Sequence, residues 1–182
     1  MARVPYLEKS DLSAEDQELL HRPISLHKAL VNSPGAARAF SSLGQYIRYG
    51  NKLDPRLREL AILQVGWLAR SPYDWSHHVK IGNDFGVTDE DIQALIDDTA
   101  DKPASLDMMS KLVLVAAREI TVDGEIARDT FRKLQAELGN EQVVDLTITI
   151  AFYNAVVRVL ATLEIDVEPE YQPYLDKFPL PV

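Results

Sequence analysis

The chain contains no cysteine among its 182 residues. Disulfides, thiolate metal sites, iron–sulfur clusters and thiol peroxidase chemistry all need a cysteine sulfur, so the sequence excludes each of them. The length is typical of one domain and is sufficient to bury a hydrophobic core. We therefore expect a single domain over residues 1–182 whose chemistry does not use sulfur redox steps.

Positive charge is also scarce, with 19 lysines and arginines against 28 acidic residues and a formal net charge of −9. An acidic surface repels nucleic-acid phosphates and anionic lipid headgroups. The densest basic pair, Arg56 and Arg58, lies beside Asp54 and Glu59. The sequence therefore predicts neither a nucleic-acid partner nor a membrane partner.

Long apolar runs are missing as well. No uncharged apolar stretch reaches the roughly 18–20 residues that span a bilayer. The first residues, MARVPYLEKSDL, lack the apolar centre of a secretory signal. These two observations favour a cytoplasmic protein.

No stretch alternates apolar and polar residues between turn signals, as an exposed strand would, and helical spacing recurs along the chain. The sequence therefore predicts an all-α fold, a compact bundle of about eight helices of which the first two are short. The expected helices cover residues 13–20, 24–31, 34–49, 55–69, 73–85, 89–97, 106–120, 126–138 and 141–163.

Helix boundaries and the most buried helix can also be predicted. Pro34 and Pro55 follow capping residues, Thr88 precedes three acids, and Gly139 interrupts the last helical region. Residues 60–69 are apolar on nearly every side, which is typical of a central helix. Four prolines in the tail 168–182 exclude a long helix there, so we expect the tail to wrap over a neighbouring surface.

Pocket-type side chains are concentrated in residues 71–78, SPYDWSHH. Asp74 and His78 are four residues apart and share a helix face. Asp74 could hold one imidazole nitrogen and leave the other free for proton transfer. The same pattern also fits a capped helix start packed on the core. Adjacent His77 and His78 point to different faces, so a shared metal ion is disfavoured and we expect none.

Glu59 immediately precedes the buried run. It could be a first-turn acid that interacts with the helix dipole, screened by Arg56 or Arg58. It could instead be a desolvated carboxylate with a raised pKa at a functional site. The sequence leaves both interpretations open.

Polar residues also interrupt the apolar last helix, where Tyr153, Asn154 and Arg158 occur. Asn154 and Arg158 share a face and need polar partners there. This face could line a pocket or a subunit interface.

Several of these segments together resemble a known family. RELAIL, SPYDWSHHVKIG and GVTDEDI within residues 53–92, and DLTITIAFYNAVVRVLATLEI near the C-terminus, look like the carboxymuconolactone decarboxylase and alkyl hydroperoxidase D-like families. The similarity spans most of residues 35–165. It leaves an N-terminal extension, 1–34, and the proline-rich tail.

The resemblance implies a set of site residues. Glu59 and His78 match the glutamate and histidine of the peroxidase motif, and Ser71 and Asp74 stand where its two cysteines would be. The implied branch is therefore the cysteine-free one. For this chain we expect His78 to be the catalytic acid or base, oriented by either Asp74 or Glu59. Substrate contacts are expected from Tyr73, Trp75, His77, Arg158, Asn154 and Ser71.

The resemblance also implies a trimer or hexamer of identical chains and an activity. The expected activity is that of a lyase or isomerase without a cofactor, acting on a small carboxylated lactone or ring acid of aromatic catabolism. Arg158 or Arg70 would hold the substrate carboxylate. A second hypothesis is a non-catalytic protein that binds a small molecule or acts only as an oligomeric partner.

Overall fold

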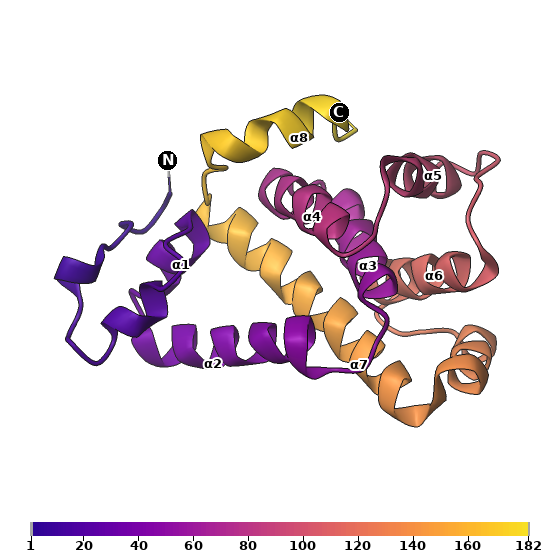
Figure 1. The fold of residues 1–182 in the computed structure, drawn as a ribbon, viewed down its shortest axis with the longest axis horizontal. Coiled ribbons are helices and arrows are strands. Elements are labelled where there is room, and N and C mark those ends of the chain that lie inside the picture. The colour runs from indigo at the N-terminus through magenta and orange to yellow at the C-terminus, as the bar shows by residue number, and fades with distance from the viewer. Residues whose placement is uncertain (1, 182) are drawn as a thin grey trace.

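A computed structural model describes residues 2–181 and contains eight α-helices and no strand in that range. Figure 1 shows the helices arranged around a long diagonal helix, with both ends of the chain toward one side. The predicted all-α class is confirmed. The helices are α1 (Ser25–Leu30), α2 (Pro34–Gln45), α3 (Pro55–Leu68), α4 (Pro72–Asp84), α5 (Asp89–Thr99), α6 (Met108–Val122), α7 (Arg128–Leu163) and α8 (Gln172–Lys177).

Helix α3 forms the centre of the molecule because it packs against α4, α6 and α7. Ten consecutive residues of α3, from Leu57 to Gly66, are buried. Its N-cap is Asp54, whose carboxylate accepts a hydrogen bond from the Leu57 amide at 3.0 Å. The expectation of a central, buried helix in this region is therefore confirmed.

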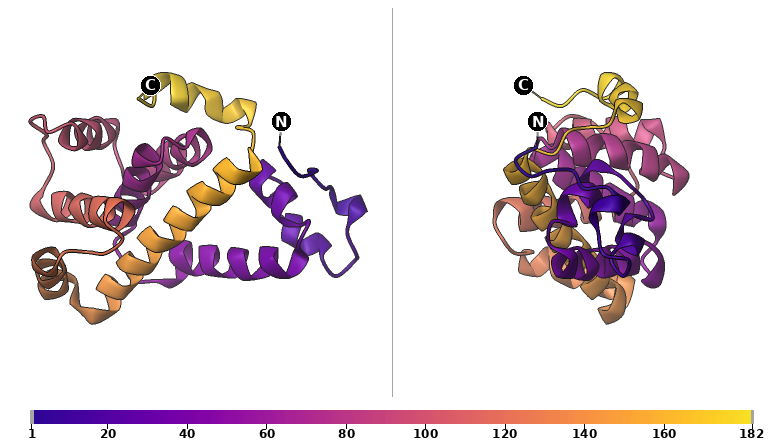
Figure 2. Two further views of the ribbon diagram at one scale, coloured as in Figure 1. Left: turned by 180° about the vertical axis from the view of Figure 1, so that it is seen from behind. Right: turned by 90° about the vertical axis from the view of Figure 1, so that its left-hand side faces the viewer.

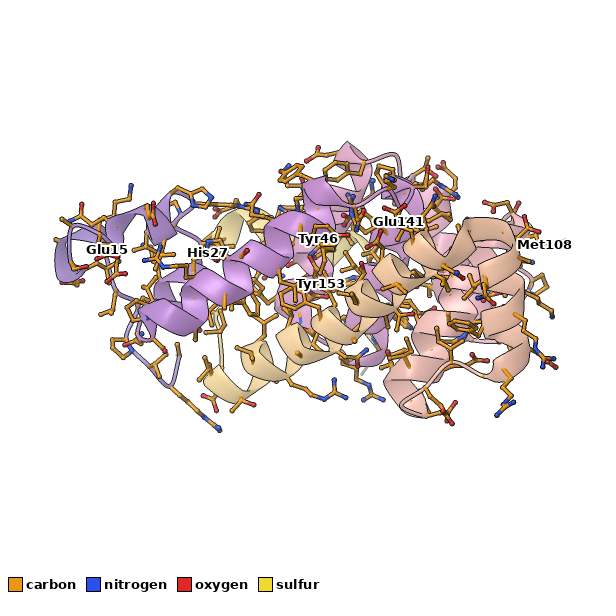
Figure 3. All side chains as sticks on the ribbon, turned by 90° about the horizontal axis from the view of Figure 1, so that it is seen from below. Glu15, His27, Tyr46, Met108, Glu141 and Tyr153 are labelled. Atoms are coloured by element: carbon orange, nitrogen blue, oxygen red, sulfur yellow. The ribbon has the colours of Figure 1, made fainter. Side chains whose placement is uncertain are left out.

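Helix α2 ends in a π-helical turn, η3 (Tyr46–Gly50). Asn51 N–H donates to the Tyr46 carbonyl at 3.1 Å, the five-residue spacing of a π-helix. This turn runs beside α7, and Tyr46 Oη donates to Asp145 Oδ1 at 2.8 Å. Figure 3 shows Tyr46 and Tyr153 where α2 and α7 approach each other. The turn also contains Arg48, which lines the same cavity as Tyr153.

Helix α7 is 36 residues long and bends at Gly139, whose φ of 73° is in the region that favours glycine. The helices expected at 126–138 and 141–163 are therefore two parts of one element with a break at the predicted residue. By length and composition α7 could cross a membrane. More than half of its most apolar window is buried inside the protein, as in the core helix of a soluble protein.

One expected helix is wrong. Residues 13–20 form only a turn and a short 3₁₀-helix, η2 (Gln17–Leu20). Ser13 Oγ donates a hydrogen bond to Asp16 Oδ2 there at 2.7 Å. Backbone amides of this segment bond to carbonyls three residues earlier, as Asp16 does to Ser13. Such local side-chain bonding competes with a regular helix.

The C-terminal segment turns back over α4, as expected from its prolines. It contains the 3₁₀-helix η4 (Pro169–Tyr171) and the six-residue α8, which packs on α4. Figure 2 shows α8 lying across the end of the bundle. Trp75 Nε1 donates to the Phe178 carbonyl at 2.7 Å and fastens this segment to the core.

Candidate functional site

Glu59 on α3 and His78 on α4 form a hydrogen-bonded pair inside the protein. Nδ1 of His78 is 2.7 Å from Oε2 of Glu59, and the two residues are 5% and 0% exposed. A carboxylate can only accept, so Nδ1 carries the proton that joins them. The other ring nitrogen, Nε2, is then the basic atom. Glu59 therefore fixes the tautomer of His78.

Arg58 holds the second oxygen of Glu59. Its Nε donates to Oε1 at 3.0 Å, and its Nη1 donates to the carbonyl of Arg48 at 3.0 Å. The Arg58 guanidinium also lies over the Phe85 ring, 4.6 Å from its centroid. Glu59 is therefore a paired buried carboxylate.

The environment sets the charge of both members of the pair. Burial alone would raise the pKa of Glu59, but the interactions with His78, Arg58 and Arg48 outweigh it and hold that pKa below its ordinary value. Burial lowers the pKa of His78, against the opposing effect of Glu59. The resting pair is an ionised Glu59 beside a neutral imidazole.

Asp74 lies one turn before His78 on α4 and is almost wholly buried. Its Oδ1 is 4.0 Å from His78 Nε2, which exceeds hydrogen-bonding distance. Glu59, rather than Asp74, therefore orients the histidine. Burial, and then the charge of Glu59, raise the pKa of Asp74 well above its ordinary value.

His78 and Asp74 open onto a cavity of about 110 Å³ between α1, α2, η3, α4 and α7. Its walls include aromatic and aliphatic side chains of α2 and α7, among them Phe40, Phe152 and Val156. Glu59 is not part of the wall and supports His78 from behind. The cavity therefore presents the basic nitrogen of His78 to any bound molecule.

Arg48 and Tyr153 complete the polar part of the cavity wall. They share a hydrogen bond, and burial raises the pKa of the Tyr153 hydroxyl. The edge of the His78 ring meets the Tyr153 ring, with centroids 4.9 Å apart. Neither Arg48 nor Tyr153 was among the expected site residues. Arg48 enters the site only through the π-helical turn, which no sequence motif indicates.

Tyr73 and His77, two expected substrate contacts, line the same cavity but are engaged with the C-terminal segment. The His77 ring stacks between Tyr73 and Tyr171, with centroids 4.0 and 3.5 Å away. His77 Nε2 is 3.2 Å from Glu168 Oε2, and Tyr73 Oη donates to Glu168 Oε1 at 3.1 Å. Glu168 thus ties these side chains to the tail.

The structure places Trp75 and Ser71 outside this cavity. Trp75 is fully buried in a second apolar cluster beside Trp67, because its helical position faces α5 and the tail. Ser71 caps α4 and accepts a hydrogen bond from the Asp74 amide at 3.5 Å. These positions support the fold around the site.

Asn154 and Arg158 are likewise outside the cavity wall. Asn154 donates to Thr121 Oγ1 at 2.9 Å and to the Ile150 carbonyl at 3.1 Å. Arg158 donates to the Asn154 side chain at 2.9 Å. The polar face of α7 therefore bonds within itself and to α6. Arg48, rather than Arg158, supplies a guanidinium to the cavity.

No group of three or more His, Asp or Glu residues able to hold a metal ion occurs within residues 2–181. His77 and His78 diverge, as the helical geometry predicts, and each has its own glutamate partner.

Residues 34–105 match the sequence model of the carboxymuconolactone decarboxylase family. This segment contains Glu59, Asp74 and His78, so the resemblance noted in the sequence is confirmed there. No curated protein matches the chain in sequence. Solved structures extend the likeness to the whole fold, which is that of the alkylhydroperoxidase D-like proteins.

The core structure of alkylhydroperoxidase AhpD, an uncharacterized peroxidase-related protein from Ralstonia eutropha JMP134, superposes with a TM-score of 0.81 at 16% identity, covering 96% of this chain and 95% of that one. A peroxidase-related protein from Silicibacter sp. TM1040 gives 0.74 at 19% identity, covering 93% and 92%. The debrominase Bmp8 gives 0.77 at 16% identity, covering 96% and 97%. A Bmp8 variant with a cysteine replaced by alanine is solved in complex with 2,3,4-tribromopyrrole.

Proposed function

We propose that this protein is a lyase or isomerase that needs no cofactor and acts on a small carboxylated ring compound by acid–base catalysis. The observation that carries this proposal is the Glu59–His78 pair, 2.7 Å apart, in which His78 lines a cavity. A histidine with a fixed tautomer and a lowered pKa is suited to act as a base near neutral pH.

The charge of the cavity wall supports an anionic substrate. All four histidines of the chain line the cavity, together with Arg22 and Arg48, although the chain as a whole carries a net charge of −9. The acid in the wall is Asp74, whose pKa is raised, so it adds little negative charge. A substrate carboxylate would find donors here, and a guanidinium can bind it through two parallel hydrogen bonds.

The size of the cavity supports a single-ring compound. Its volume of about 110 Å³ is close to the roughly 150 Å³ of an engineered apolar cavity that admits benzene. The related fold of Bmp8 holds tribromopyrrole, which is also one small ring. The apolar wall would cover the ring, and Arg48 would hold its carboxylate.

His78 would act on the ring through Nε2, as base in an isomerisation or as positioning contact in a decarboxylation. Glu59 would stabilise positive charge that develops on the imidazole, because their hydrogen bond becomes charge-assisted when His78 gains a proton. Such acid–base assistance contributes on the order of 10²–10⁴ in rate.

The proposal is tested with freshly generated 4-carboxymuconolactone, followed by ultraviolet absorbance. We expect wild type to consume it without added cofactor, and His78→Ala and His78→Gln to be slower by on the order of 10², because the contact that positions the substrate is lost. Glu141→Gln is the control, because Glu141 lies on the surface in an exposed pair with Lys52. Equal rates in wild type and both His78 variants would refute the assignment of His78.

A thermal-shift experiment on the same samples separates catalysis from binding alone. A ligand that binds the folded state raises stability by RT ln(1 + [L]/Kd). Stabilisation by ring carboxylates with no turnover on long incubation would favour the non-catalytic hypothesis.

Assembly remains a prediction of the resemblance. Four large apolar side chains are exposed in the single chain: Leu43 on α2, Tyr46 on η3, and Val144 and Ile148 on α7. Light scattering at several concentrations will show whether the protein is the expected trimer or hexamer.

A further inference from the structure

We propose that Asp74 is a neutral carboxylic acid in the resting protein and is the proton donor of this site, opposite the basic nitrogen of His78. This inference rests on the proposed function and assigns its acid. Of the two residues that the sequence offered for orienting His78, Glu59 does so, bonded to Nδ1 at 2.7 Å, and Asp74 is left without that role.

The surroundings of Asp74 provide no compensation for a negative charge. The residue is 2% exposed, and its Oδ2 is buried without a hydrogen-bond partner among residues 2–181. No lysine or arginine of that range makes an ion pair with it; the one pairing is the 4.0 Å approach to His78. An unpaired buried carboxylate is so costly that the group takes up a proton instead.

No charged or titratable group that the structure describes around Asp74 offsets the cost of ionising it. Glu59 on α3 is ionised, and its charge adds to burial in raising the pKa of Asp74. His78 on α4 is neutral at rest, and Tyr153 on α7 keeps its proton. Arg48 on η3 lines the same cavity, but its guanidinium bonds to Tyr153.

The separation of Asp74 from His78 leaves room for a substrate atom. At 4.0 Å, Oδ1 and Nε2 are too far apart to bond to each other, and both residues line the cavity. One atom at hydrogen-bonding distance from each can fit between them. A protonated acid and an unprotonated base close to the same substrate atom form the arrangement that proton transfer needs.

In a decarboxylation, Asp74 supplies the proton that takes the place of CO₂. The bond from the ring to the carboxylate carbon breaks, CO₂ leaves, and the electron pair passes through the conjugated system toward the lactone carbonyl. Asp74 delivers its proton to the resulting carbanion, becomes a carboxylate, and recovers a proton from water. In an isomerisation, His78 takes a proton from one carbon, Asp74 gives one to another, and solvent exchange restores both groups.

The first arm of the test needs no substrate. Urea unfolding of wild type and Asp74→Asn is measured between pH 5 and pH 7. An unfolded aspartate ionises near pH 3.9, whereas the folded Asp74 keeps its proton, so the contribution of Asp74 to stability is present at low pH and is lost as pH rises. The unfolding constant of wild type relative to the variant should rise roughly tenfold per pH unit, up to about 100-fold over this range.

Asp84→Asn is the matched control, with the same substitution on the same helix at a side chain that is 61% exposed. The unfolding constant of wild type relative to Asp84→Asn should not change between pH 5 and pH 7. Infrared spectra of wild type give a second readout if Asp74→Asn folds poorly, because a protonated carboxyl has its own C=O band, which should be present at pH 7. A flat ratio for Asp74→Asn, or a missing band, would overturn the inference.

The second arm measures turnover of 4-carboxymuconolactone. Asparagine retains a hydrogen-bond donor but cannot transfer a proton, so Asp74→Asn should lose on the order of 10²–10⁴ in kcat with little change in KM. A variant as active as wild type would overturn the donor role alone. An inactive wild type with the pH-dependent ratio intact would overturn the proposed function and the donor role together, while the neutral state of Asp74 would stand.

Discussion

Oε2 of Glu59 accepts a hydrogen bond from His78 Nδ1 at 2.7 Å, and this contact links the central helix α3 to the cavity-lining helix α4. Arg58 holds the other oxygen of Glu59. The central helix therefore fixes both the position and the tautomer of the imidazole. The same pair serves stability and the proposed chemistry.

Replacing Glu59 by Gln should destabilise the protein strongly. Arg58 would remain buried beside an uncharged amide, and breaking one partner of a buried ion pair costs about 3–5 kcal/mol. Urea unfolding at pH 7 measures the loss. Glu141→Gln, on the surface, should change the free energy of unfolding by no more than about 0.5 kcal/mol, and equal effects of the two substitutions would contradict this account.

The pH dependence of kcat/KM should reflect the neutral form of His78. Burial lowers the pKa of this residue, so activity should persist below pH 6.5 and fall only as pH drops through the lowered value. Because the charge of Glu59 raises the pKa of His78, Glu59→Gln should move this acidic limb to still lower pH. An acidic limb of kcat/KM that lies above pH 6.5 would show that His78 is not the titrating base. A limb that moves to higher pH in Glu59→Gln would show the same.

Gly66 on α3 is required by its closeness to Asp74. A Cβ at this position would lie 2.8 Å from Asp74 Oδ2 and 3.5 Å from the Trp75 amide nitrogen. Gly66→Ala should therefore cost about 1–3 kcal/mol through overpacking. In an Asp74→Ala background the obstructing carboxyl is gone, so the cost should shrink, and a double-mutant cycle measures the coupling. Strictly additive effects would argue against this contact.

Glu168, in the tail, should hold the N-terminal segment to the tail beside the cavity-lining residue Tyr73. Its Oε1 accepts hydrogen bonds from the Ser25 amide at 2.6 Å and from Tyr73 Oη. Burial alone would raise the pKa of Glu168, but its interaction with His77 and the hydrogen bond from the Ser25 amide outweigh it and lower the pKa to about 2. Its contribution to stability is thus present above about pH 4.3 and is lost as pH falls toward 2.

Glu168→Gln should consequently lose about 1–3 kcal/mol at pH 7 and match wild type near pH 2. Urea titrations at the two pH values test this. Glu170→Gln, at an exposed neighbouring position, is the control. A difference that persists at pH 2 would point to packing rather than to the charge of Glu168.

Local signals in the sequence predicted much of the fold. Thr88 caps α5 as expected, with its Oγ1 accepting from the Asp91 amide, and Gly139 breaks α7 where glycine alone adopts the required backbone. The turn at residues 13–20 was mispredicted because side-chain bonds between near neighbours are not visible in helical periodicity. The boundary of α6 shifted by two residues because Asp107, rather than an earlier residue, provides its cap.

The site was harder to predict because it depends on contacts between distant segments. Periodicity placed Asp74 and His78 on one face, but the partner of His78 is Glu59, which comes from another helix. Trp75 belongs to the same dense motif, yet its helical angle turns it toward α8 and the apolar core. Arg48 and Glu168 reach the site through a π-helical turn and the returning tail, which the sequence alone does not position.

The proposed acid–base site would transform a ring acid without a cofactor. The most direct measurement is the mass balance of 4-carboxymuconolactone turnover in D₂O by dialysed protein, with CO₂ and the deuterium content of the product recorded together. We expect one CO₂ released and one solvent-derived deuterium added per molecule consumed by wild type, and almost no conversion by His78→Ala. Unchanged substrate after long incubation with folded wild type, or identical conversion by His78→Ala, would contradict it.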